Sequence, residues 1–250
     1  MTLFGYRVPM MASLLAWCVI WEIVGQAGVS FLVPPLSDVL VAAFSLVQTG
    51  SWQAAALTTL NSFLIGMALA IVAGVVIGVL MGRSTLADNL LGIWVNIFVS
   101  APLSALVPVL MILFGMGETT VVVTVFLFAV WIIVLDTRAG IQAVPRSLEE
   151  MGRSYGAGGL RLYSKIILLA ALPEILAGIR LGMVRGVKGV VIGQLLVSII
   201  GYGELFELYS RNFDMENFWA LTIILFAAAM GLSALIENIE KRVEYYAGVR

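Results

Sequence analysis

Apolar residues occur in this chain as runs about as long as a lipid bilayer is thick. The runs cover about residues 8–24, 55–81, 89–114, 119–135, 174–200 and 218–236. A helix needs about 20 mostly apolar residues to cross a bilayer, whereas a barrel strand needs about 10 residues of alternating polarity. Since a helix also satisfies its own backbone hydrogen bonds in lipid, we expect an all-α membrane protein. It would have six transmembrane helices in one domain, residues 1–250.

The composition excludes an ordinary water-soluble domain. Hydrophobic residues make up 61% of the chain and charged residues 12%, whereas soluble domains are roughly 45–50% apolar and about 25% charged. Such a chain cannot cover its surface with polar groups, so its main environment is the lipid bilayer. The formal net charge of -1 provides no basic field that would indicate a nucleic-acid partner.

Several kinds of chemistry lack the residues that they need. The chain has no His, and Cys18 is its one cysteine, so His-based catalysis, His metal ligation and an internal disulfide are excluded. No Gly-x-x-x-x-Gly-Lys-Ser/Thr loop occurs, so nothing here would cradle nucleotide phosphates. We therefore expect no catalytic residue, no metal and no cofactor in this chain. If ATP drives it, a separate ATPase subunit binds the ATP and magnesium.

The connections between the runs carry turn and helix signals. No small-residue cleavage site follows the first run, so residues 8–24 predict an uncleaved span. Pro34 and Pro35 precede a short surface helix that reaches about Gln48. Pro102 and Pro108 are expected to kink the third span. Polar segments are expected at 136–138, which would close the fourth span, at 201–216 as a loop, and at 237–250 as a tail.

Basic residues predict the orientation of the six spans, because Lys and Arg mark the cytoplasmic side. One side of the predicted topology would carry ten of them: Arg7, Arg83, Arg138, Arg146, Arg153, Arg161, Lys165, Lys241, Arg242 and Arg250. The opposite side would carry only Arg211 among several acids. Both termini and the segment 145–173 are therefore expected in the cytoplasm.

The segment from Leu148 to Pro173 is a charged interruption between the fourth and fifth spans. Pro145 begins a short predicted helix, with Glu149 and Glu150 in its first turn, where acids complement the helix dipole. The glycines at 156–159 would end this helix, and a second helix over 160–172 would lie at the membrane surface.

The same segment resembles the EAA loop of ABC-importer permeases. The matching residues are Glu150, Gly156 six positions later, Ile166 and Pro173, with Met151 and Gly152 in place of two alanines. Further similar phrases are Leu32–Ser37, Ala105–Glu118 with its Phe-Gly-x-Gly-Glu ending, and Leu172–Arg180. The chain looks most like the branch that imports nitrate, sulfonates and taurine.

The resemblance implies a type I importer permease that forms a homodimer in the bacterial cytoplasmic (inner) membrane. Its expected partners are a second permease copy, two ATPase subunits and an external solute-binding protein. By resemblance, the residues that couple to the ATPase are Leu148, Glu149, Glu150, Gly152, Gly156, Ala157, Ile166 and Pro173. Small residues among them would allow close seating on the ATPase.

Charged residues in the fifth span are the candidates for the translocation pathway, because intramembrane charge usually faces a cavity or a partner charge. Arg185 and Lys188 lie about 60° apart around the helix axis and would favour an anionic or zwitterionic solute. Arg180 and Gln194 are further candidates, and Gln194 stands where many relatives have an acid. The alternative for the basic residues is snorkelling or structural pairing, above all for Arg180, near the cytoplasmic end.

Other interpretations stay open at this point. Glycines every four residues in the second and fifth spans allow close helix packing, either within one bundle or against the partner subunit during gating. The protein could instead be a secondary transporter driven by an ion gradient, although no inverted repeat is evident. A membrane enzyme is disfavoured because no nucleophile and base cluster together. The solute could also be a vitamin precursor or an aromatic acid.

Overall fold

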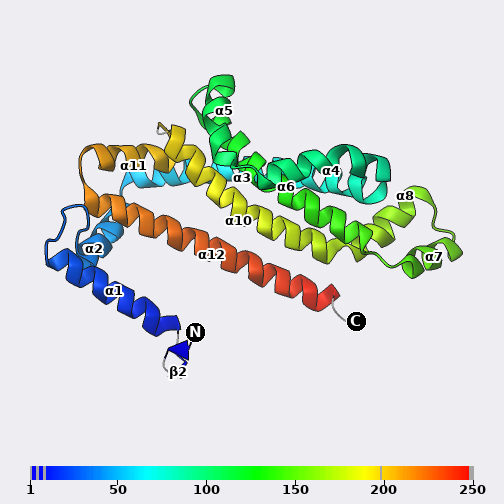
Figure 1. The fold of residues 1–250 in the computed structure, drawn as a ribbon, viewed down its shortest axis with the longest axis horizontal. Coiled ribbons are helices and arrows are strands. Elements are labelled where there is room, and N and C mark those ends of the chain that lie inside the picture. Colours follow the sequence, from blue (N-terminus) through cyan, green and yellow to red (C-terminus); the bar gives the residue numbers. More distant parts are fainter. Residues whose placement is uncertain (1, 4–5, 8–9, 198, 248–250) are drawn as a thin grey trace.

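The computed structural model describes residues 2–3, 6–7, 10–197 and 199–247, and it is almost entirely helical (Figure 1). The helices are α1 (Met10–Gln26), α2 (Leu36–Val47), α3 (Gly50–Arg83), α4 (Thr85–Ser100), η1 (Leu103–Leu106), α5 (Val107–Phe114), α6 (Glu118–Gln142), α7 (Arg146–Ser154), α8 (Gly159–Leu162), η2 (Tyr163–Ile167), α9 (Leu168–Ala170), α10 (Leu172–Val197), α11 (Gly201–Arg211) and α12 (Met215–Ala247). Two short strands, β1 (Thr2–Leu3) and β2 (Tyr6–Arg7), pair antiparallel. The all-α prediction is confirmed.

Three helices in the described part are long and apolar enough to cross a membrane alone: α3, α6 and residues Met215–Leu232 of α12. Two bent helix pairs raise the number to five if each pair is one span. The apolar part of α1, Ala12–Gln26, is shorter. By length and composition, the structure therefore supports three to five of the six predicted spans. Residues 8, 9 and 198 of the predicted spans, and Arg250, lie outside the described residues.

The predicted third span, 89–114, is bent at Pro102, as its sequence predicts, but not at Pro108. Its two halves, Thr85–Ser100 and Leu103–Phe114, meet at an angle of 96°. Ala101 is extended, with φ -70° and ψ 145°, because a residue before proline is disfavoured in the helical region. Pro102 then precedes the 3-10 turn η1. Pro102 thus breaks the helix, whereas Pro108 lies in the first turn of α5 and is tolerated there.

Two other predicted boundaries are corrected by tertiary contacts. The fourth span does not close at 136–138, because α6 continues to Gln142 with Thr137 buried against Gly78 of α3. The predicted loop 201–216 is mostly the helix α11, whose Leu205 and Phe206 are buried. The tail is helical to Ala247 as part of α12. The short surface helix before Gln48 is confirmed as α2.

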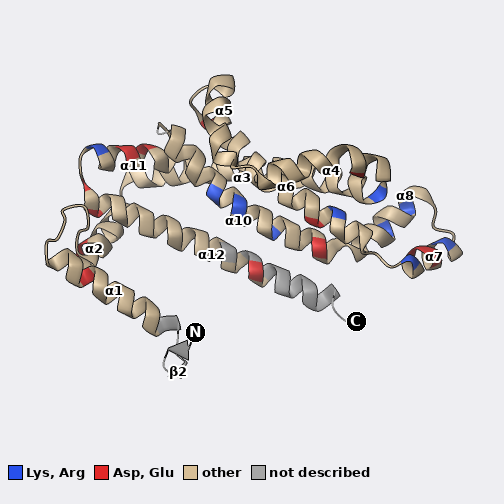
Figure 2. Cartoon of the chain, in the orientation of Figure 1, with Lys and Arg blue, Asp and Glu red and all other residues tan. Residues whose placement is uncertain are grey.

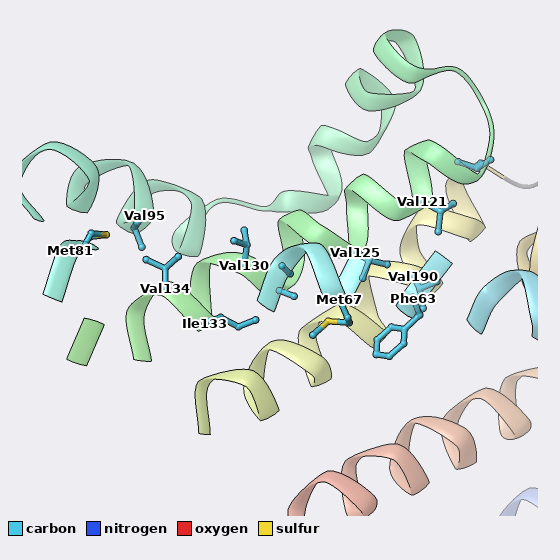
Figure 3. Packing of buried hydrophobic residues seen from close by; sticks show 13 residues of the cluster. Phe63, Met67, Met81, Val95, Val121, Val125, Val130, Ile133, Val134 and Val190 are labelled. Atoms are coloured by element: carbon cyan, nitrogen blue, oxygen red, sulfur yellow. The ribbon is translucent and has the colours of Figure 1, made fainter. Parts of the chain in front are cut away.

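The core lies along α6, which packs between α3 and α10. Figure 3 shows Val125 and Ile133 of α6 beside Phe63 and Met67 of α3 and Val190 of α10. These side chains belong to one buried cluster, so the three helices form a single packed unit.

Both rows of glycines serve this packing within the chain. On α3, Gly66, Gly74, Gly78 and Gly82 lie against Val125, Ile133, Thr137 and Ile141 of α6. On α10, Gly178, Gly182, Gly189 and Gly193 also face α6, and Gly186 faces Met67 of α3. The alternative in which a glycine row lies against a partner subunit is therefore not what the structure shows.

A second buried cluster joins α2, α11 and α12 at the end of the molecule opposite α7 (Figure 1). α1 is tied to this end by polar contacts. The Glu22 carboxylate accepts hydrogen bonds from the backbone N–H and the hydroxyl of Ser37, both at 2.9 Å. The Trp21 indole donates to the carbonyl of Pro34 at 3.0 Å.

Candidate coupling and translocation sites

The helix α7 lies at one end of the molecule, beyond the ends of α6 and α10 (Figure 1). It starts after Pro145 and ends in a turn at Gly156, whose φ of 78° is unfavourable for other residues. The N–H of Gly156 donates to Arg153 and the N–H of Ala157 donates to Gly152, both at 2.9 Å. This is a Schellman ending, so Gly156 and Ala157 define where α7 stops.

α7 is held to the following helix at Gly152. A Cβ atom at Gly152 would collide with the Cδ1 atoms of Ile166 and Leu162. The small size of Gly152 is thus used inside this chain, and its expected part in seating the ATPase stays a prediction. Of the acids on α7, Glu150 is exposed and Glu149 is half-buried, as is Leu148.

The segment after α7 is packed against the ends of the core helices. Residues Tyr163–Ile167 form a π-helical turn, and Gly159–Ala170 is bent by 63° relative to α10. The Arg83 guanidinium, at the end of α3, lies 4.3 Å from the centre of the Tyr163 ring. Ile167 is buried with Ile141 of α6. Pro173 lies in the first turn of α10, where a missing N–H is tolerated.

Basic residues gather around α7, α8 and the neighbouring helix ends, whereas acids predominate at α11 (Figure 2). Asp88 at the start of α4 and Arg138 of α6 form a two-pronged ion pair at this basic end, with N–O distances of 2.6 and 2.7 Å. The structure therefore places Arg83, Arg138 and the arginines of α7 and α8 at the same end of the molecule (Figure 2).

The charged residues of α10 differ in their surroundings. Arg180 and Arg185 are half-buried, and Lys188 is exposed. Asp136 of α6 lies over Gly178, so a Cβ there would be 2.7 Å from the Asp136 Cβ. Arg185 attracts Asp136, and Glu174 repels it. The sequence does not single out Asp136, because a charge after an apolar run ordinarily marks the end of a span.

Gln194 is buried, with 1% of its surface exposed. Its Oε1 accepts a hydrogen bond from the Thr59 hydroxyl at 3.0 Å and from the Tyr202 N–H at 3.3 Å. Gly201 and Gly203 lie against it, so α10, α3 and α11 meet at this side chain. Burial raises the pKa of the Tyr202 phenol. In this conformation Gln194 joins helices, and its place in the pathway stays a prediction.

Lys188 lies on the wall of an apolar groove of about 600 Å³ between α10, α11 and α12. We call it the Lys188 groove; its lining residues are Val187, Lys188, Val191, Ile192, Leu195, Phe206, Phe218, Trp219, Thr222, Leu225, Phe226 and Ala229. Among the described residues, no three His, Cys, Asp or Glu side chains are grouped as metal ligands.

The fold and the charged helix at its end match a known family over most of the chain. Residues 70–245 match the family described as binding-protein-dependent transport system inner membrane component. The chain belongs to this family. Its members are permease subunits, which are transport components and not enzymes. Together with the apolar helices, membership in this family makes the chain a multi-pass membrane protein.

Curated relatives lie in the predicted branch. The taurine transport system permease protein TauC of Escherichia coli is 27% identical over 74% of this chain and 68% of its own length. The nitrate import permease protein NrtB of Leptolyngbya laminosa is 25% identical over 77% and 68%. The putative aliphatic sulfonates transport permease protein SsuC of Bacillus subtilis is 29% identical over 90% and 82%. The predicted branch is thereby confirmed.

Solved structures show the same fold. The chain superimposes on an amino acid ABC transporter with histidines at a TM-score of 0.61 and 19% identity, covering 74% of this chain and 91% of that one. It superimposes on the MetNI methionine ABC transporter at 0.59 and 21% identity, covering 80% and 95%. The helical arrangement is therefore that of an ABC transporter permease.

Proposed function

We propose that this chain is the membrane-spanning subunit of an ATP-driven importer in the bacterial cytoplasmic membrane. Two copies would surround one pathway, two ATPase subunits would dock at the α7 end, and an external binding protein would deliver solute at the α11 end. The matched family supports the ATPase and the binding protein as partners. The basic end formed by α7 and α8 (Figure 2) supports a cytoplasmic α7, since Lys and Arg favour that side.

The observation that carries the proposal is the position of α7. It is a nine-residue helix outside the core, with one side held through Gly152 and with Glu150 exposed. Leu148, Glu149 and Glu150 would contact the ATPase, while Gly156 and Ala157 shape the helix end. Ile166 and Pro173 would support α7 from the chain behind it. Closure of the ATPases would move α7 and switch the pathway from inward to outward access.

The solute is a small anion or zwitterion in this proposal. The relatives above are named for taurine, nitrate and sulfonates. α10 carries Arg185 and Lys188 in its middle, and basic groups at that depth suit an anionic solute. Arg180 and Gln194 would hold α10 in place beside them.

The test is a charge reversal on α7. Glu150→Lys should prevent co-purification with the ATPase subunit and abolish ATP-dependent uptake, because it replaces the exposed acid with a base. The matched control is Glu204→Lys, an exposed acid near the start of α11 at the opposite end. The control should leave ATPase binding intact.

Normal ATPase binding and uptake in Glu150→Lys would count against docking through α7. Uptake that continues after the ATPase is inactivated would indicate instead a transporter driven by an ion gradient. Both variants should elute as the wild-type protein does in size-exclusion chromatography, which separates lost docking from misfolding.

A further inference from the structure

We propose that the Lys188 groove binds the solute and that the solute is an organic anion with an apolar body. The acidic group would lie at Lys188, and the alkyl or aryl body would lie along the groove. Alkyl and aryl sulfonates or carboxylates fit this description, whereas nitrate and bicarbonate do not. This inference rests on the proposed function and narrows its solute class.

Lys188 is placed where a positive charge needs a counter-charge. It lies nine residues before the end of α10 at Val197, about 14 Å along the helix axis. Within the described residues, no hydrogen bond or ion pair holds its ammonium group. A charge at such depth in a membrane protein is costly unless it meets water, a partner charge or a ligand. An anionic group on the solute supplies that partner.

The rest of the groove offers apolar contact. Lys188 is the one charged residue among its lining residues. The Thr222 hydroxyl already donates a hydrogen bond to the carbonyl of Phe218 at 2.9 Å. The groove therefore recognises one charge and an apolar surface, which describes an amphipathic anion.

One wall of the groove is built of aromatic rings that hold each other in place. The rings of Phe206 and Phe218 meet edge to face at 5.2 Å, and Trp219 lies 6.2 Å from Phe218. The Trp219 indole donates to the carbonyl of Leu32 at 2.8 Å. Since these rings are held by contacts within the chain, their orientation is restricted, which reduces the entropy lost on binding.

The size of the groove separates organic from inorganic anions. Its volume of about 600 Å³ lies in the ordinary range of small-molecule sites, about 300–1,000 Å³. Nitrate would meet Lys188 and leave the apolar wall uncovered. An alkyl chain would cover that wall, and affinity should rise about fourfold for each buried methylene.

The experiment measures binding to the purified permease–ATPase complex in phosphatidylcholine nanodiscs, without the binding protein. Ethane-, butane- and hexanesulfonate and nitrate are titrated by calorimetry. We expect affinity to rise with chain length and nitrate not to compete with hexanesulfonate. Lys188→Met should weaken hexanesulfonate binding by about tenfold or more, the usual loss for a charge-assisted contact. Lys165→Met, at an exposed lysine of η2, should not.

A second variant tests the apolar part of the groove. Ala229→Phe would fill the space on the α12 side, so binding should lose its dependence on chain length while ATPase binding stays intact. Each variant is compared in ATP-dependent uptake of hexanesulfonate by proteoliposomes that also contain the binding protein.

The outcomes separate this inference from the proposed function. Affinity that is independent of chain length, or unchanged by both variants, would overturn the inference even if ATP-driven uptake of another anion is observed. Displacement of hexanesulfonate by phosphatidylglycerol in the nanodiscs would assign the groove to lipid. Dissociation of the permease dimer by Ala229→Phe would assign it to the second copy. Absence of any ATP-driven uptake would instead count against the proposed function.

Discussion

The row of glycines between α3 and α6 makes a quantitative prediction at Gly78. A Cβ atom there would lie 2.5 Å from the Thr137 Cβ, 2.8 Å from its Cγ2 and 2.9 Å from the Val134 carbonyl oxygen. Carbon atoms in contact prefer about 3.5–4.0 Å. Gly78→Ala would therefore have to separate the two helices by about 1 Å.

The cost follows from what the extra methyl group meets. The Thr137 Cβ and the Val134 carbonyl are close to the backbone and cannot swing away as a side-chain end can. Overpacking of this kind costs about 1–3 kcal/mol. The separation would also loosen the contacts of Gly74 and Gly82, which lie in the same row against Ile133 and Ile141. We expect Gly78→Ala to lower the free energy of unfolding by about 1–3 kcal/mol.

The matched control is Gly231→Ala in α12, where nothing lies within 4 Å of the added atom. Alanine in an open helix position stabilises by up to about 1 kcal/mol relative to glycine, so the two changes should have opposite signs. The measurement is unfolding of the purified protein in detergent micelles by added dodecyl sulfate, followed by circular dichroism. A Gly78→Ala protein as stable as the control would contradict close packing of α3 against α6 at this glycine.

Two further changes probe buried polar contacts by the same unfolding measurement. Gln194→Leu should cost about 1–3 kcal/mol, because the Tyr202 N–H loses its acceptor, whereas the Thr59 hydroxyl keeps the carbonyl of Ala55 at 2.8 Å. Faster amide exchange at Tyr202 would locate the effect, and the exposed Gln142→Leu should show neither change. Arg138→Gln should cost about 1.5–3 kcal/mol, because its pair with Asp88 is only 29% and 20% exposed. Arg211→Gln, whose pair with Glu207 has an arginine 77% exposed, should cost less than about 0.5 kcal/mol; equal costs would contradict the role of burial.

Local patterns were sufficient for much of the coupling segment. The start of α7 after Pro145 and its end at Gly156 follow from backbone preferences that act within a few residues. The role of Gly152 could not be read in this way. Its contact, Ile166, lies on the next helix, and only the folded turn between the helices brings the two together.

Charge was the least reliable signal for helix ends. Asp136 and Arg138 predict the end of a span, yet α6 continues past both to Gln142. Arg138 is neutralised by Asp88 from α4, and Asp136 is attracted by Arg185 of α10. Partners that are far apart in the sequence make these charges tolerable inside a helix, and no local sequence pattern indicates which residues those partners are.

Hydrophobicity and the satisfaction of backbone hydrogen bonds depend on each segment alone, so the amino-acid pattern is sufficient to show that the chain is helical and belongs in a membrane. It also located the charged segment between the fourth and fifth apolar runs, and its resemblance indicated the right family. Tertiary structure decided the 96° break after α4, the use of both glycine rows against α6, and the groove beside Lys188. Those features depend on which faces of the helices meet, and that choice is made by packing among residues distant in the chain.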